Sequence, residues 1–278
     1  MTQFDKAMRF QALHQREKAF VIPNPWDAGT ARILASLGFE AMATTSAGLA
    51  FSLGRRDAEG ALTRNEILTN AKLIVEATDL PVSADLENGF GDAPEIVAET
   101  IHLAAECGLV GRSIEDATGR KEQPIYDFSL SVERIAAAAE SVRRLPFPFV
   151  LVARAENFLH GRPDLNETIR RLQTYEAAGA DVLFAPGLPN AEAIREVCCA
   201  VTKPVNVVMG LRGYNYTIDQ LTALGVKRVS LGSSLSRAAL SGLISAAREI
   251  IDDGTFSFAN KAISFDETNS LMVESPGW

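Results

Sequence analysis

The sequence predicts a single (β/α)8 barrel, a closed sheet of parallel strands surrounded by helices. Short apolar segments alternate with amphipathic helical segments along most of the 278 residues, and about eight such units over ~250 residues make this barrel. Polar residues follow several successive strands, and in a barrel these strand ends converge on one mouth. A doubly wound open sheet has the same alternation. However, no Gly-x-Gly-x-x-Gly turn follows the first strand, where a dinucleotide-binding sheet would carry one.

Each predicted strand is a short apolar run, and each predicted helix has apolar residues at helical spacing. The strands are expected at residues 20–23, 41–45, 82–85, 109–115, 149–154, 181–185, 205–209 and 228–231. The helices are expected at residues 27–37, 64–78, 94–106, 132–144, 165–178, 191–200, 217–224 and 234–252. Several helices end at a glycine, which is typical of a left-handed C-cap: Gly38, Gly108, Gly179 and Gly225.

Residues 1–254 are therefore assigned to the barrel and residues 255–278 to a C-terminal extension. The extension loses helical periodicity but contains the large apolar residues Phe256, Phe258, Phe265 and Trp278. Apolar side chains of this size predict packing on a neighbouring subunit, and hence an oligomer.

Charge and composition restrict the partners. The formal net charge is −8 without basic runs, which argues against nucleic acid and anionic membrane surfaces. No apolar run approaches the ~20 residues of a membrane span, and the N-terminus lacks the apolar core of a signal peptide. Cys107, Cys198 and Cys199 form neither a metal spacing nor a disulfide framework. We therefore expect reduced thiols and a cytoplasmic protein.

Acidic residues follow the third and fourth strands. Side chains two positions apart in a strand share a face, so Asp85 and Glu87 are expected to point the same way. Glu115 ends the next strand and is expected to point inward, with Asp116 on the opposite side. Crowded carboxylates repel unless protons or a cation neutralise them. An all-oxygen cluster favours Mg²⁺ first and Mn²⁺ second, whereas the alternative is helix capping or pairing with lysines.

Three loops add candidates for binding. Asp57 lies where it can reach the cation or its waters, and the small residues Ser46, Ala47 and Gly48 let backbone N–H groups approach an anion. The polar loop at residues 117–130 can close over a substrate and bring in Lys121; the alternative is a solvated surface loop. Residues 232–234 resemble a phosphate cradle, although Ser234 as an ordinary N-cap explains them nearly as well. The three histidines, His14, His102 and His160, are assigned no role.

Arg154 closes an apolar strand, where a buried guanidinium needs an anion. It is interpreted as a clamp on a substrate carboxylate or phosphate; a salt bridge to the acids named above is the alternative.

Four motifs occur in order: Ser-x-Gly at Ser46, Asp-x-Glu-Asn-Gly-Phe-Gly at Asp85, Ile-Glu-Asp at Glu115 and Ala-Arg at Arg154. As an ordered set over residues 20–242, they resemble the isocitrate lyase and phosphoenolpyruvate mutase superfamily. The resemblance implies a barrel whose last helix is exchanged with a neighbour in a dimer, usually within a homotetramer. It also implies Mg²⁺ and a small α-keto or α-hydroxy acid as substrate.

Carried over by position, the resemblance makes Asp85 the direct metal ligand, with Asp57, Glu87 and Glu115 holding the ion largely through water. It makes Arg154 the carboxylate clamp. The substrate's other oxygens fall to Ser46 and to the backbone of Ala47 and Gly48.

The chain departs from the superfamily pattern in two places. The lyases carry Lys-Arg-Cys-Gly-His in the mobile loop, and here Lys121 matches the lysine while Gln123 stands at the cysteine. The phosphonate mutases place Asn there, which Gln123 resembles. After Arg154 the superfamily commonly shows Thr-Asp, whereas this chain has Ala155-Glu156.

The leading hypothesis is a Mg²⁺-dependent lyase or decarboxylase that cleaves a C–C bond in such an acid through an enolate-like intermediate. The predicted catalytic residues are Lys121, Arg154 and Glu115, and Gln123 and Asn206 join the predicted substrate contacts. One alternative is a P–C bond mutase or hydrolase acting on a phosphonopyruvate-like compound. Another is a barrel that binds an α-keto acid without turning it over. The sequence names neither the acid nor the general acid/base.

Overall fold

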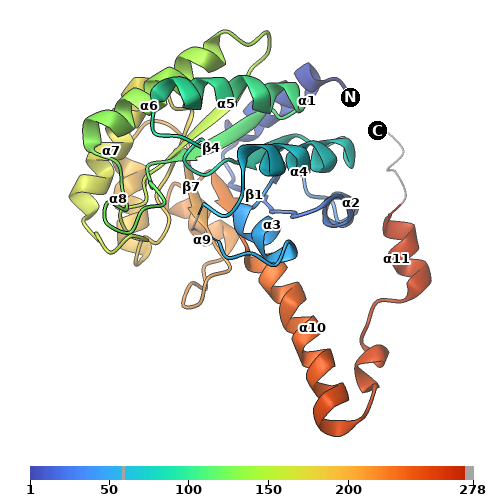
Figure 1. The fold of residues 1–278 in the computed structure, drawn as a ribbon. Helices are drawn as coiled ribbons and strands as arrows, with labels where there is room; N and C mark the ends of the chain where they lie inside the picture. Colours follow the sequence, from blue (N-terminus) through green and yellow to red (C-terminus); the bar gives the residue numbers. More distant parts are fainter. Residues whose placement is uncertain (58–59, 273–278) are drawn as a thin grey trace.

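Eight parallel strands form one sheet in the order β1-β8-β7-β6-β5-β4-β3-β2, which confirms the predicted barrel (Figure 1). The structure, a computed structural model, describes residues 1–57 and 60–272; Trp278, expected to pack on a neighbour, lies outside these residues. The strands are β1 Phe20–Ile22, β2 Met42–Ala43, β3 Val82–Asp85, β4 Gly111–Glu115, β5 Val150–Arg154, β6 Val182–Phe184, β7 Val205–Val208 and β8 Arg228–Ser230.

The sheet closes between β1 and β2 through hydrogen bonds formed by residues that lie outside the regular pairing of these two strands. The Ala43 N–H donates to the Pro23 carbonyl at 3.0 Å, and the Asn24 side-chain amide donates to the Thr44 carbonyl at 3.0 Å. These bonds bring the carboxyl ends of the first two strands together at the mouth.

The register places a row of paired residues across the sheet from mouth to floor. The row runs Glu115, Arg154, Phe184, Asn206, Arg228 and Phe20. Glu115 is the last residue of β4, whereas Phe20 is the first residue of β1. A closed sheet requires such a stagger. One row therefore carries polar side chains from the mouth down to the floor.

The helices are α1 Gln3–Leu13, α2 Ala28–Ser36, α3 Ser46–Ser52, α4 Arg64–Glu76, α5 Pro94–Glu106, α6 Phe128–Arg143, α7 Leu165–Ala178, α8 Ala191–Ala200, α9 Ile218–Ala223, α10 Ser234–Asp253 and α11 Phe265–Leu271, with a 3₁₀ turn η1 at Ser257–Asn260. The predicted helices are confirmed within a few residues of their ends. Helices α1, α3 and α11 are absent from the helices expected from the sequence pattern. No helix in residues 1–57 and 60–272 has the length and apolar character needed to span a membrane.

The segment from Ser46, expected to be a loop, begins α3. The Thr45 side chain accepts a bond from the Gly48 N–H at 3.2 Å and caps the helix. A Cβ at Gly48 would lie 2.6 Å from Thr45 Cγ2 and 3.0 Å from Trp26 Cβ. Glycine is therefore required by close packing rather than by a turn.

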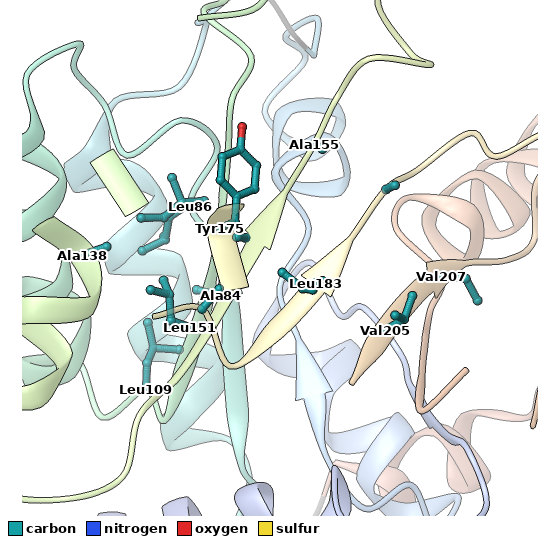
Figure 2. Close-up of a cluster of buried hydrophobic side chains, with 14 of the residues drawn as sticks. Ala84, Leu86, Leu109, Ala138, Leu151, Ala155, Tyr175, Leu183, Val205 and Val207 are labelled. Atoms are coloured by element: carbon teal, nitrogen blue, oxygen red, sulfur yellow. The ribbon is translucent and has the colours of Figure 1, made fainter. Parts of the chain in front are cut away.

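Two apolar layers hold the barrel. One lies between the sheet and the surrounding helices; Figure 2 shows part of it, including Leu109, Ala138, Leu151 and Leu183. The other fills the lower barrel, where α1 closes the floor. The ring of Phe10, which is fully buried, meets Phe20 and His14 edge-on at centroid distances of 6.5 and 4.8 Å.

Helix α10 projects away from the barrel like an arm, and η1 and α11 return toward α2 (Figure 1). Ser236 is the buried residue of α10, and its exposed apolar side chains include Leu243, Ile244 and Ile251. Near the end of the described chain, Arg32 on α2 donates to the Met272 carbonyl.

Replacing Phe10 with Ala should lower the free energy of unfolding by about 3–5 kcal/mol, because it opens a cavity under a fully buried ring. Chemical denaturation of the purified protein measures this change. Phe4→Ala is the matched control, since Phe4 lies on the same helix and is 51% exposed. Equal losses in the two variants would contradict the role of α1 as the floor.

Candidate active site

A larger and a smaller cavity open at the carboxyl ends of the strands. The outer cavity measures about 750 Å³ and the deep cavity about 250 Å³. Ser46, Asp57, Arg154 and Leu159 line both, so the two are contiguous. The deep cavity extends inside the barrel to Arg228 at the start of β8. A ligand can therefore contact the strand ends and the interior at once.

Asp85 ends β3 and is held by the start of α3. Its Oδ2 accepts hydrogen bonds from the Ser46 hydroxyl at 2.9 Å and from the Ser46 N–H at 3.3 Å. Its own N–H donates to Thr44 Oγ1 at 3.0 Å. The other oxygen, Oδ1, is buried without a hydrogen-bond partner among the described residues. This oxygen is therefore available to accept a hydrogen bond or to bind a cation.

Glu87 reaches the same site by a different route from the one predicted. Strand β3 ends at Asp85, the next residue Leu86 is buried, and Glu87 has a φ of 46°. The expectation that strand alternation alone aligns the two acids is therefore wrong. The turn still brings the carboxylates together: burial, then Asp85 and Asp57, raise the pKa of Glu87 to about 7. A left-handed backbone at a non-glycine residue is a strained feature.

Arg154 lies among three carboxylates. Its Nη1 is 3.3 Å from Glu115 Oε2 and 4.0 Å from Asp85 Oδ1, and its Nε donates to Glu156. Burial alone would lower the pKa of Arg154, but the carboxylates, Glu156 foremost, raise it above its usual value. Burial raises the pKa of Glu115 well above its ordinary range. The structure thus shows the ion pairs; the clamp on a substrate stays a prediction.

Asp116 points away from the cavity, on the opposite side of the strand from Glu115, as the alternation predicts. Its Oδ1 accepts from the Glu156 N–H at 2.8 Å, and its Oδ2 accepts from the Tyr175 hydroxyl at 2.6 Å and from Arg171 at 3.1 Å. This buried network fixes the backbone just after Arg154. No periodic pattern predicts this network, because its members are far apart in the chain.

The loop after β4 places its predicted residues outside both cavities. Lys121 and Gln123 are exposed, whereas Thr118 and Gly119 line the outer cavity. Arg120, adjacent to Lys121, pairs with Asp92 at 2.8 Å. The roles of Lys121 and Gln123 stay predictions, because they require the loop to move.

Sequence reasoning assigned no role to two residues that line the cavities. His160 lies on the outer cavity with Nε2 3.7 Å from Glu156 Oε2. Arg228 lies in the deep cavity beside Asn206, whose amide donates to Ser230 at 3.0 Å. In β8 the polar residues Arg228 and Ser230 alternate with apolar residues, and this pattern could have indicated that both point to the same face of the sheet.

The donor set fits a hard divalent cation, although the acids are not gathered around a common point. Among residues 1–57 and 60–272, no three Asp, Glu, His or Cys side chains are placed to hold a metal together, and Arg154 stands between Asp85 and Glu115. Yet Asp85 Oδ1 accepts no hydrogen bond among the described residues, and the pKa values of Glu87 and Glu115 are raised by burial and neighbouring acids. Such carboxylates favour a cation with oxygen ligands.

Comparison with known proteins identifies the family. The family model described as phosphoenolpyruvate phosphomutase matches residues 10–251. The chain belongs to this family. The sequence resemblance to the isocitrate lyase and phosphoenolpyruvate mutase superfamily is therefore confirmed.

Relatives within the superfamily carry several names. The uncharacterized protein Rv1998c of Mycobacterium tuberculosis is 34% identical over 88% of this chain and 90% of its own length. The 2,3-dimethylmalate lyase of Eubacterium barkeri is 28% identical over 96% and 93%. A 2-methylisocitrate lyase of Halalkalibacterium halodurans is 31% identical over 73% and 67%, and an oxaloacetate decarboxylase of Ectopseudomonas mendocina is 28% identical over 86% and 82%.

Solved structures agree with the barrel. A Burkholderia cenocepacia J2315 protein provisionally called a lyase/mutase is 58% identical, with a TM-score of 0.95 over 99% of this chain and 97% of its own. A phosphonopyruvate hydrolase in complex with oxalate and Mg²⁺ has a TM-score of 0.86 over 98% and 95%. At 23% identity, the latter shows likeness of fold alone.

In metal-free buffer, the free energy of unfolding should fall as pH rises from about 4.5 to about 7. Folding raises the pKa of Glu87 from its ordinary value of 4.5 to about 7. The folded state therefore binds more protons than the unfolded state in this window, and it loses stability as Glu87 ionises. Denaturation across this range, with EDTA present, measures the slope.

Glu87→Gln should flatten that slope, whereas Glu122→Gln, on the exposed loop, should leave it as in the wild type. An unchanged slope in Glu87→Gln would show that Glu87 is not responsible.

Proposed function

We propose that this protein is a Mg²⁺-dependent lyase or decarboxylase that cleaves a C–C bond in a small α-keto or α-hydroxy carboxylic acid. One observation carries the proposal: Oδ1 of Asp85 accepts no hydrogen bond among the described residues and lies among crowded acids, 4.0 Å from the buried guanidinium of Arg154. Relatives named as lyases and as an oxaloacetate decarboxylase support the reaction class.

Asp85 would hold the Mg²⁺ ion directly, and Asp57, Glu87 and Glu115 would hold it largely through water. A single direct ligand is compatible with the lack of a three-residue cluster among the described residues. When bound, Mg²⁺ supplies positive charge that stabilises the enolate-like anion formed on C–C cleavage, an effect of several kcal/mol.

The protein's own groups orient the acid. Arg154, held at Nε by Glu156, would turn its Nη groups from Glu115 and Asp85 to the substrate carboxylate. A bidentate guanidinium–carboxylate pair fixes orientation as well as charge. Ser46 and the N–H groups of Ala47 and Gly48 would bind the remaining oxygens. Closure of the loop after β4 would exclude water and bring in Lys121 and Gln123.

A P–C bond mutase or hydrolase acting on a phosphonopyruvate-like compound is the second candidate, favoured by the match to the phosphoenolpyruvate phosphomutase family model. A barrel that binds an α-keto acid without turning it over is the third, because Lys121 and Gln123 lie outside the cavities. The free thiols of Cys107, Cys198 and Cys199 are consistent with a reducing compartment such as the cytoplasm, which stays a prediction.

Oxaloacetate, methylisocitrate and phosphonopyruvate should be screened for release of pyruvate or phosphate, and phosphonopyruvate also for conversion to phosphoenolpyruvate, with Mg²⁺ and with EDTA. We expect turnover of at least one acid that EDTA abolishes and added Mg²⁺ restores. Asp85→Ala should reduce kcat/KM at least 10³-fold (about 4 kcal/mol). Asp79→Ala, at a half-exposed ion pair with the N-terminus, should keep full activity. If no acid reacts with any divalent metal, the lyase and mutase assignments both fail.

We propose that the chain forms a homo-oligomer, a dimer or tetramer, in which α10 packs on a neighbouring barrel and exchanges places with its counterpart. The helix carries a row of exposed apolar residues, Leu240, Leu243, Ile244, Ile250 and Ile251, with Ile251 81% exposed. An apolar surface of this kind on a projecting helix marks an interface. Residues 255–278 would extend the same contact beyond the barrel of residues 1–254.

The double variant Ile244→Glu, Ile251→Glu should sediment as a monomer in analytical ultracentrifugation, because buried charges would oppose the contact. Leu73→Glu, at an isolated leucine of α4 that is 52% exposed, should leave the assembly intact. A wild-type monomer at micromolar concentration would refute the exchange.

A further inference from the structure

The floor of the deep cavity carries a buried guanidinium with no anionic partner in the described chain. Arg228 is 4% exposed and lines the cavity, and its Nε and Nη1 have no hydrogen-bond partner among the described residues. Its register neighbour, Asn206, is also buried, and the Asn206 amide nitrogen donates to Ser230. Buried polar groups are nearly always satisfied, so a buried guanidinium with two unpartnered nitrogens requires a specific explanation.

The surroundings of Arg228 do not supply that partner. The Phe10 ring lies 5.7 Å from its guanidinium carbon and gives a weak cation–π contact. His14 is the nearby titratable group, and burial and Arg228 lower the pKa of His14 to about 3, so it stays neutral. Burial alone lowers the pKa of Arg228, to about 9, which leaves it charged at neutral pH. A buried charge without a counter-ion is costly.

The position of Arg228 relates it to Arg154. Both belong to the paired row that descends from mouth to floor, and both line the deep cavity. Arg154 contacts three carboxylates, and the carboxylates Asp57 and Asp85 line the same cavity. The cavity-lining neighbours of Arg228 in the sheet, Asn206 and Ser230, are neutral. The cavity therefore has a guanidinium toward each end, and only the one near the mouth is paired.

We propose that the deep cavity contains an anion subsite in which the Arg228 guanidinium binds a compact oxyanion. The favoured source of this oxyanion is a second carboxylate of the substrate. The acid would then be a dicarboxylate spanning from Arg154 to Arg228, an assignment that rests on the proposed function. A small free oxyanion, such as bicarbonate, has the same recognition chemistry. A planar guanidinium binds either one bidentately.

Arg112 is the matched control. It too is fully buried with Nε, Nη1 and Nη2 unpartnered among the described residues. However, Arg112 lies on β4 between residues that point into the barrel, and its side chain contacts the turn at Gly89. It lines neither the outer nor the deep cavity. Removing its charge tests the effect of a buried arginine as such.

Binding should be measured by calorimetry without turnover, using oxalate, malonate, succinate and glutarate, each beside the monocarboxylate of equal carbon number. The wild type should bind at least one dicarboxylate tenfold or more tightly than its monocarboxylate counterpart. Arg228→Met should reduce that ratio to near one and leave the monocarboxylate Kd unchanged, and Arg112→Met should keep the wild-type ratio. Arg228→Lys keeps a single point charge and should give an intermediate ratio of dicarboxylate to monocarboxylate affinity. This variant tests the proposal if Arg228→Met does not fold.

Bicarbonate and sulfate alone distinguish the source. If either binds to the wild type but not to Arg228→Met, and a monocarboxylate binds alongside it, the occupant is a free oxyanion at the proposed subsite. If Arg228→Met and Arg228→Lys bind every anion as the wild type does, or lose mono- and dicarboxylates equally, the subsite is refuted. Because no step needs catalysis, a failed substrate screen would leave this result intact.

Discussion

The balance of charge around Arg154 governs the mouth of the barrel. A guanidinium at the end of β5 is compatible with burial because acids from the ends of β3 and β4 and from the segment after β5 converge on it. The acids in turn tolerate their crowding because one cation lies among them. Neither set is stable alone in an apolar surrounding. The Asp116, Tyr175 and Arg171 network holds the Glu156 backbone from behind, so the charged groups meet in a fixed geometry.

The fold and much of this cluster were predictable because their signals are local. Strand and helix periods, together with the glycines at helix ends, place the eight units, and acids at successive strand ends must meet once the sheet closes. Asp85, Glu115 and Arg154 were found in this way. The helix at Ser46 was missed because the close packing of Gly48 depends on Trp26, which lies outside any local window. The turn at Glu87 was missed because a left-handed non-glycine residue contradicts its own propensity.

Other features depend on tertiary context alone. His160 and Arg228 gain meaning only from what the barrel places around them: Glu156 in one case, and neutral amides and hydroxyls in the other. Lys121 illustrates the reverse limit. Its sequence position suggests chemistry, whereas the fold leaves it on an exposed loop tied back through Arg120 and Asp92. A role for Lys121 in catalysis would require the loop after β4 to move.

The floor formed by α1 affects how substrate enters the site and how products leave it. Phe10 and Phe20 pack across the lower barrel, and the deep cavity opens into the outer cavity at the mouth. Two fragments produced from one molecule would then share a single exit. The fragment bound deeper in the cavity, toward Phe10, would leave second. The shape of the cavity would therefore set the order of product release.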